Sequence, residues 1–94
     1  MEIRFHLDPE TDLPHIYDHG VTEKEVKQVL ASRGDDFHGK KNSMIRFGQT
    51  ERGRYLKVIY VPDEHGDEVF VITAYDMKNN ERKAYRRRHR RKRQ

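Results

Sequence analysis

The chain has 94 residues and a mass of 11.4 kDa, enough for one small domain and too little for two. Charged residues make up 38% and hydrophobic residues 33%, so the core must be thin, and the lack of cysteine excludes disulfides, thiolate metal sites and cysteine nucleophiles. There is no signal-peptide pattern and no apolar run long enough for a membrane span, so a soluble, cytoplasmic protein is expected.

The formal net charge of +4 is divided unevenly along the chain. Residues 78–94 hold ten Lys or Arg and one acid, whereas residues 1–77 hold ten Lys or Arg and fifteen Asp or Glu. The molecule is therefore an acidic body with a strongly basic C-terminal segment. Such an asymmetry indicates a polyanionic or acidic partner for that segment.

The first predicted elements are a strand and a short helix. Apolar and polar residues alternate over residues 3–7, as in a half-buried strand. Leu13, Ile16 and Tyr17 then recur at helical spacing, and Gly20 follows them. Glycine readily takes the left-handed conformation that ends a helix, so we expect this helix to end there.

The second helix has clear signals at both ends. Thr22 and Glu25 have the spacing of a capping box, in which each side chain accepts a hydrogen bond from a backbone N–H of the other residue. Gly34 favours an end near residue 33. The polar residues 35–42 predict a loop. The expected buried stripe of this helix consists of Val26, Val29 and Leu30.

Three strands and a last helix complete the pattern. The predicted strands cover residues 44–50, 54–61 and 68–75, with short turns between them. The middle strand is almost continuously apolar, which predicts a central position with both faces buried. The last helix is expected from about residue 80 through residue 90.

The predicted order is strand, helix, helix, three antiparallel strands and helix. This order is typical of an α+β fold in which helices pack on one face of an antiparallel sheet. Residues 1–88 are expected to form the single domain. Residues 89–94 are expected to be a frayed basic tail, because like charges repel and no apolar side chain holds the segment down.

The basic segment is the clearest functional signal. Guanidinium groups pair with phosphate oxygens, so an Arg-rich helix is suited to a nucleic-acid backbone. A solubilising tail, or an arm that docks on an acidic protein, is the alternative. The predicted nucleic-acid-binding residues are Lys83, Arg86, Arg87 and Arg90.

The sequence contains no Ser-His-Asp arrangement, phosphate-binding glycine loop or dinucleotide fingerprint, and its histidines lack metal-ligand spacing. No metal and no cofactor are therefore expected. RNA cleavage needs neither, because the 2′-hydroxyl is the nucleophile. The protein must move two protons and stabilise the charge on the phosphorane.

Candidate catalytic residues follow from that chemistry. Lys41 and Arg54 would stabilise phosphate charge, and Tyr75 would move a proton beside Arg82 at the junction of the last strand and helix. Strand alternation places Arg54 and Lys57 on opposite faces, so at most one of these two cations can be catalytic. For each cation alone, an ordinary solvated charge is the alternative, and for Tyr75 it is an aromatic at the edge of the core.

Three segments in order carry a family resemblance: HGVTEKEV at 19–26, FGQT with GRYLKVIY at 47–50 and 53–60, and VITAYDM at 71–77. They resemble the BrnT-type toxins of type II toxin–antitoxin systems and the small uncharacterised relatives of that family. The likeness spans about residues 3–88.

The resemblance implies a RelE-like ribonuclease fold, a bacterial cytoplasmic setting and RNA cleavage without a cofactor. It also implies a cognate antitoxin, a small DNA-binding protein encoded alongside. BrnT proteins commonly have Arg where this chain has Tyr75, whereas RelE-type enzymes use a Tyr near the end of the sheet. The leading hypothesis is a metal-independent endoribonuclease that cuts mRNA. The alternatives are a non-catalytic module that binds nucleic acid or antitoxin, and a degenerate toxin that keeps only its partner interface.

Overall fold

The computed structural model describes residues 2–90, which form one five-stranded sheet with a short 3-10 helix and two α-helices. The elements in chain order are β1 (Glu2–Phe5), η1 (His15–His19), α1 (Glu23–Ala31), β2 (Asp35–His38), β3 (Met44–Gln49), β4 (Tyr55–Pro62), β5 (Glu68–Asp76) and α2 (Asn79–Arg90). The predicted α+β class is confirmed.

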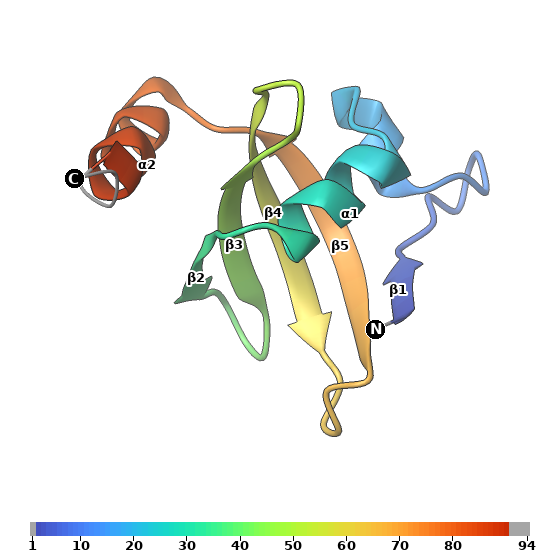
Figure 1. Cartoon of the computed structure of the whole chain (residues 1–94). Coiled ribbons are helices and arrows are strands. Elements are labelled where there is room, and N and C mark those ends of the chain that lie inside the picture. The colour runs from blue at the N-terminus through green and yellow to red at the C-terminus, as the bar shows by residue number, and fades with distance from the viewer. Residues whose placement is uncertain (1, 91–94) are drawn as a thin grey trace.

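The sheet has the order β1-β5-β4-β3-β2, and β4 is its middle strand (Figure 1). Strands β2 to β5 pair antiparallel in sequence, whereas β1 pairs parallel to β5. The sheet is therefore mixed and open, with β1 and β2 at its edges, and the prediction of a purely antiparallel sheet is wrong at β1. No helix in the described part of the chain is long and apolar enough to cross a membrane.

Helix α1 packs on one face of the sheet and begins with the predicted capping box. The Thr22 hydroxyl accepts a hydrogen bond from the Glu25 N–H, and the Glu25 carboxylate accepts one from the Thr22 N–H. A Cβ on Gly48 of β3 would lie 2.7 Å from Val29, so glycine at this position lets the helix approach the sheet closely. The core under α1 and η1 is formed by Ile16, Val21, Val26, Val29, Leu30, Leu56, Val58, Tyr60, Val69, Val71 and Ala74.

The opposite face of the sheet is only partly covered. Along β4, buried residues alternate with half-buried ones, so Leu56 and Val58 are fully buried whereas Lys57 and Ile59 are half-buried. The predicted central position of this strand is confirmed. The predicted burial of both its faces is wrong, because no helix within residues 2–90 covers the second face along the whole strand.

Helix α2 contacts this second face rather than the face under α1. Glu81 of α2 pairs with Lys57, and the Tyr85 ring lies edge-on to the Tyr55 ring at a centroid distance of 5.9 Å. Figure 1 shows α2 beyond the β2–β3 side of the sheet. The expectation that all helices pack on one face is therefore wrong for α2, because the inner face of α2 carries polar groups that pair with polar groups of the second face.

Three further predictions need correction. The segment expected to be a loop contains strand β2, which pairs with β3 from Asp35 opposite Phe47 to His38 opposite Met44. Polar residues suit this strand because it lies at the sheet edge. The predicted first helix is a single 3-10 segment, which does end at Gly20 in the left-handed conformation. Residues 89 and 90 belong to α2, and the remainder of the expected tail, 91–94, lies outside the described residues.

Candidate nucleic-acid interface

The outer face of α2 carries the four residues predicted to bind nucleic acid. Lys83, Arg86, Arg87 and Arg90 are all exposed, and together they line a shallow groove of about 280 Å³. Their spacing places them on one side of the helix. Within residues 2–90, none of the four is in an ion pair with a carboxylate. Like charges this close repel each other, and a bound polyanion would relieve that repulsion.

The inner face of α2 carries two side chains, Arg88 and His89, that already contact a carboxylate. Arg88 Nε lies 2.6 Å from Asp35 Oδ2, and His89 Nε2 lies 3.2 Å from the same oxygen. Burial raises the pKa of Asp35, but the hydrogen bond and charge of Arg88 outweigh it, and the net pKa is lowered. Asp35 therefore stays ionised and holds the inner side of α2, while the outer cations face solvent.

A second candidate region is a hollow of about 680 Å³ on the open face of the sheet. Its apolar lining consists of Ile45, Ile59, Val61 and Ile72. Its polar lining includes Lys40, Lys41, Lys57 and Tyr75. We call this region the open-face hollow. It combines an apolar surface, a phenol and ammonium groups, which suits a ligand with both flat apolar and anionic parts.

Lys57 is the most constrained cation of the open-face hollow. Its Nζ lies 3.0 Å from Glu81 Oε2, 5.7 Å from the Phe47 ring centroid and 5.5 Å from the Tyr75 ring centroid. Burial lowers the pKa of Lys57, but the hydrogen bond to Glu81 and the nearby Tyr75 outweigh it, and the net pKa is raised. Lys57 is therefore held charged, with Glu81 of α2 as its counter-ion.

Tyr75 lies against a histidine that the sequence did not single out for this site. The ring centroids of Tyr75 and His19 are 5.4 Å apart. His19 is the last residue of η1. Its position follows from η1 lying against β5, beyond the short stretch where β1 pairs with that strand. This arrangement is tertiary, so local sequence patterns give no signal for it.

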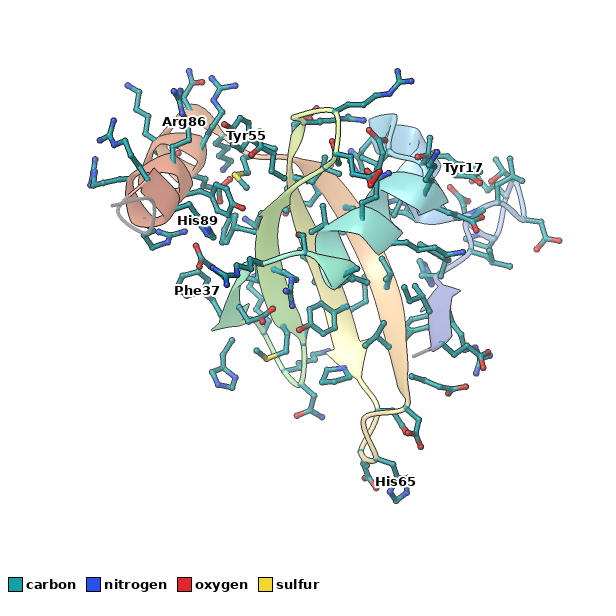
Figure 2. The ribbon with its side chains drawn as sticks, viewed as in Figure 1. Tyr17, Phe37, Tyr55, His65, Arg86 and His89 are labelled. Carbon is teal, nitrogen blue, oxygen red and sulfur yellow. The ribbon has the colours of Figure 1, made fainter. Side chains whose placement is uncertain are left out.

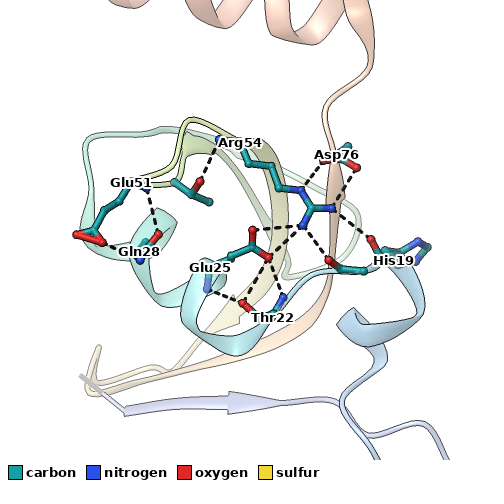
Figure 3. Close-up of polar contacts among 9 residues, drawn as sticks. His19, Thr22, Glu25, Gln28, Glu51, Arg54 and Asp76 are labelled. Atoms are coloured by element: carbon teal, nitrogen blue, oxygen red, sulfur yellow. Dashed lines mark hydrogen bonds and ion pairs between the residues drawn. The ribbon is translucent and has the colours of Figure 1, made fainter.

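Arg54 occupies a different place from the one its predicted role requires. Its guanidinium contacts Asp76 (Nε to Oδ1, 2.8 Å), Glu25 (Nη1 to Oε1, 3.0 Å) and the Gly20 carbonyl oxygen (2.8 Å), as Figure 3 shows. The hydrogen bond to Asp76 is the main reason that the pKa of Arg54 is raised. Arg54 therefore cross-links α1, the end of η1 and β5, and it does not line the open-face hollow.

The four predicted catalytic residues do not converge. Lys41 and Tyr75 line the open-face hollow. Arg82 is exposed, donates a hydrogen bond from Nη2 to Asn79 Oδ1 at 2.7 Å, and does not line that hollow. Strand alternation placed Lys57 and Arg54 on opposite faces of the sheet, and Lys57 is the one of the two that lines the hollow. The structure thus groups Lys41, Lys57 and Tyr75, and leaves Arg54 and Arg82 outside.

A larger hollow at the far end of the sheet is unsuited to an anion. It has a volume of about 760 Å³, and its charged residues are three acids, Asp63, Glu64 and Glu68, and a single cation, Arg4. This negative balance disfavours phosphate. The anion-binding candidates of the described chain are therefore the open-face hollow and the grooves along α2.

The residues placed to hold a metal ion are Asp8, His15 and Asp18, whose ligand atoms lie within 4.8 Å of one another. His15 and Asp18 are already paired, with His15 Nδ1 3.3 Å from Asp18 Oδ2. Asp8 lies near this pair because the chain turns back between Leu7 and Pro14, which form an isolated β-bridge. The sequence did not indicate this cluster, because its spacing matches no short metal motif.

Comparison with protein families, curated proteins and solved structures finds no match for this chain.

Proposed function

We propose that the protein binds single-stranded RNA in the bacterial cytoplasm, and that the outer face of α2 holds the phosphate backbone. One observation carries this proposal: Lys83, Arg86, Arg87 and Arg90 lie on one side of a helix and have no carboxylate partner among the described residues. Each phosphate that such a cation neutralises releases a counter-ion condensed on the nucleic acid, and this release favours binding.

The distribution of charge supports RNA binding at α2 rather than on the body of the chain. The body of the chain is acidic, so its overall field repels nucleic acid. Arginine pairs with phosphate through two parallel hydrogen bonds and stays charged at every physiological pH. The resemblance to BrnT-type toxins favours RNA over DNA as the polyanion.

A second candidate function is RNA cleavage, as in a type II toxin, and the open-face hollow favours it. There the 2′-oxygen would attack the phosphorus while its proton leaves, and the 5′-oxygen would depart and take up a proton. Tyr75, Lys41 and Lys57 line this hollow; Tyr75 would move one proton, and the two lysines would stabilise the charge on phosphate. A gene for a small DNA-binding antitoxin next to this one would support the toxin assignment.

Binding is tested by fluorescence anisotropy of a labelled uridine 12-mer at about 0.1 M salt. The test variant changes Lys83, Arg86, Arg87 and Arg90 to Gln, and we expect it to bind more than about tenfold more weakly. The matched control changes four exposed cations of the body to Gln: Arg4, Lys24, Lys27 and Arg52. Equal affinity of the two variants would contradict the proposal.

Cleavage is tested by incubating the protein with RNA in the presence of EDTA. We expect Tyr75→Phe and Lys41→Gln to slow cleavage. We expect Tyr17→Phe, which removes a hydroxyl that binds Glu23 outside the hollow, to leave the rate unchanged. RNA that stays intact with the unmodified protein would remove the catalytic candidate and leave the binding proposal standing.

A further inference from the structure

A separate groove lies between α2 and the ends of β3 and β4, at the border of the outer and inner faces of the helix. It has a volume of about 310 Å³. Its lining residues are Gln49, Tyr55, Tyr85, Arg86, His89 and Arg90. Figure 2 labels three of them, Tyr55 on the sheet and Arg86 and His89 on α2. We call this region the α2 groove. Its lining combines aromatic rings, an amide and two guanidinium groups.

The aromatic wall of the α2 groove is held in a fixed arrangement. The His89 and Tyr85 rings are stacked, with centroids 4.0 Å apart and an angle of 29° between the ring planes. Asp35 holds the His89 ring from outside the groove through the 3.2 Å contact to Nε2. Tyr85 itself is only 5% exposed, so its ring supports the His89 ring from behind and is not open to a ligand. Tyr55 and His89 are the half-buried rings that a ligand can reach.

The two arginines of the groove differ from Arg88, which lies on the opposite side of the helix. Arg88 is satisfied by Asp35, whereas Arg86 and Arg90 have no carboxylate partner within residues 2–90. Arg86 and Arg90 are one helical turn apart and border the same groove. Their charge is therefore concentrated next to the aromatic wall and remains open to an anion.

The amide of Gln49 adds a hydrogen-bonding group with a fixed orientation. Its Nε2 donates to the Gly53 carbonyl oxygen at 3.2 Å, which leaves Oε1 without a donor among the described residues. A carbonyl oxygen oriented in this way can accept a hydrogen bond from the amino group of a base. The groove therefore offers an aromatic surface, an acceptor and two phosphate-binding cations within one small space.

We propose that the α2 groove is a binding site for one nucleoside monophosphate unit. Arg86 and Arg90 bind its phosphate, and its base packs on the wall of Tyr55 and His89. The inference rests on the proposed RNA binding and deepens it, because it assigns one nucleotide of the strand to a defined subsite. Bases stack on aromatic side chains largely irrespective of sequence, and Arg pairs with phosphate at fixed geometry.

A free nucleotide and a nucleotide unit of RNA share this chemistry, so the test uses both. The probes are AMP, ribose 5-phosphate and the uridine 12-mer, and the readout is the change in backbone amide NMR signals together with the affinity. We expect saturable shifts at residues 49, 55 and 86–90. We expect AMP to bind about tenfold more tightly than ribose 5-phosphate, because only AMP brings a base to the wall.

Two kinds of variant separate the base from the phosphate. Tyr55→Leu keeps an apolar side chain on β4 but removes the ring, and we expect it to bring the affinity for AMP down to that for ribose 5-phosphate. The double variant R86Q/R90Q is a surface change on α2 that keeps the sheet intact, and it should weaken both ligands. The control K24Q/K27Q removes two exposed charges from α1 and should leave both affinities unchanged.

The possible outcomes separate the groove from RNA binding. Tight binding of AMP that depends on Tyr55 supports the groove, even if the 12-mer does not bind and the proposed RNA function fails. Binding of the 12-mer without preference for AMP over ribose 5-phosphate overturns the groove and leaves RNA binding standing. Equal loss of AMP affinity in R86Q/R90Q and K24Q/K27Q would show a response to overall charge, and it would also overturn the proposal.

Discussion

The two faces of the sheet have similar apolar side chains but very different surroundings. Under α1, Leu56 and Val58 of β4 are completely buried. On the other face, the neighbouring Ile59 is half-buried, and Lys57 reaches the open-face hollow. The covered face stabilises the fold, and the open face, with α2 at its end, leaves apolar and cationic side chains accessible.

The arginines follow the same division. Arg54 makes hydrogen bonds to two carboxylates and to two backbone carbonyl oxygens near the covered face. Arg86 and Arg90 on α2 have no carboxylate partner among the residues described. An arginine with all its donors satisfied is a structural cross-link, whereas one without a counter-ion is available to a partner. Counting basic residues in the sequence does not separate the two kinds.

The largest expected difference between the faces comes from two alanine substitutions on the same strand. Leu56→Ala should lower the free energy of unfolding by about 3 kcal/mol, because it leaves a cavity in the core. Ile59→Ala should cost about 1 kcal/mol or less, because its side chain is already partly hydrated. Urea denaturation measures both values. Equal losses would mean that another part of the chain or a partner covers the open face.

The next largest effect concerns Arg54. Arg54→Met should lower the free energy of unfolding by about 2–3 kcal/mol, because Glu25 and Asp76 lose their shared partner. Its affinity for RNA should stay that of the unmodified protein. Arg52 is an exposed neighbour of Arg54, so Arg52→Met should change the free energy of unfolding by less than about 0.5 kcal/mol. A stable Arg54→Met protein with weakened RNA binding would reverse the roles assigned here.

A smaller loss of stability is expected in acid. The pKa values of Glu25, Asp35, Asp76 and Glu81 are lowered in the folded chain, against the opposing effect of burial. Hydrogen bonds from backbone N–H groups contribute most to this lowering at Glu25 and Glu81, and all four carboxylates also have cationic partners. The unfolded chain therefore binds more protons than the folded one just below pH 4–5, so stability falls as pH falls through this range. Thermal unfolding between pH 7 and 3 checks this sign. A melting temperature that rises toward pH 3 would contradict these ion pairs.

The smallest predicted effect tests the start of α1 on the covered face. Thr22→Ala should cost about 1 kcal/mol, because the Glu25 N–H loses the hydroxyl that caps the helix. Thr22→Ser should restore most of that stability, since serine is an equally good N-cap. Urea denaturation of the two variants distinguishes loss of the cap from a general effect of shortening the side chain. An unstable Thr22→Ser protein would argue against the cap.

Local patterns in the sequence predicted much of the fold. The capping box at Thr22, the turn at Gly20 and three of the strands depend on neighbouring residues, and the structure has each of them. Strand β2 did not give such a signal, because its polar residues are typical of loops and it becomes a strand only by pairing with β3. Burial on both faces of β4 was also predicted wrongly, because an apolar strand does not reveal whether a helix covers it.

The candidate site was harder to predict than the fold. Strand alternation correctly placed Lys57 and Arg54 on opposite faces, but only the structure shows that the acids Glu25 and Asp76 surround Arg54. His89 stood within a run of arginines, and nothing local indicated that Asp35, more than fifty residues away, would hold its ring. Contacts between distant segments decide which charged side chains have an ion-pair partner, and the local spacing of residues does not reveal these contacts.

The salt dependence of RNA binding separates phosphate binding by α2 from binding elsewhere on the chain. Affinity for the uridine 12-mer is measured from about 0.05 to 0.5 M salt for the unmodified protein and for the variant that lacks the four outer cations of α2. A plot of log affinity against log salt should have a slope of roughly −3 for the unmodified protein, from about −0.7 per phosphate contact on single strands, and a slope near zero for the variant. Parallel lines for the two proteins would contradict the assignment of the phosphate-binding surface to α2.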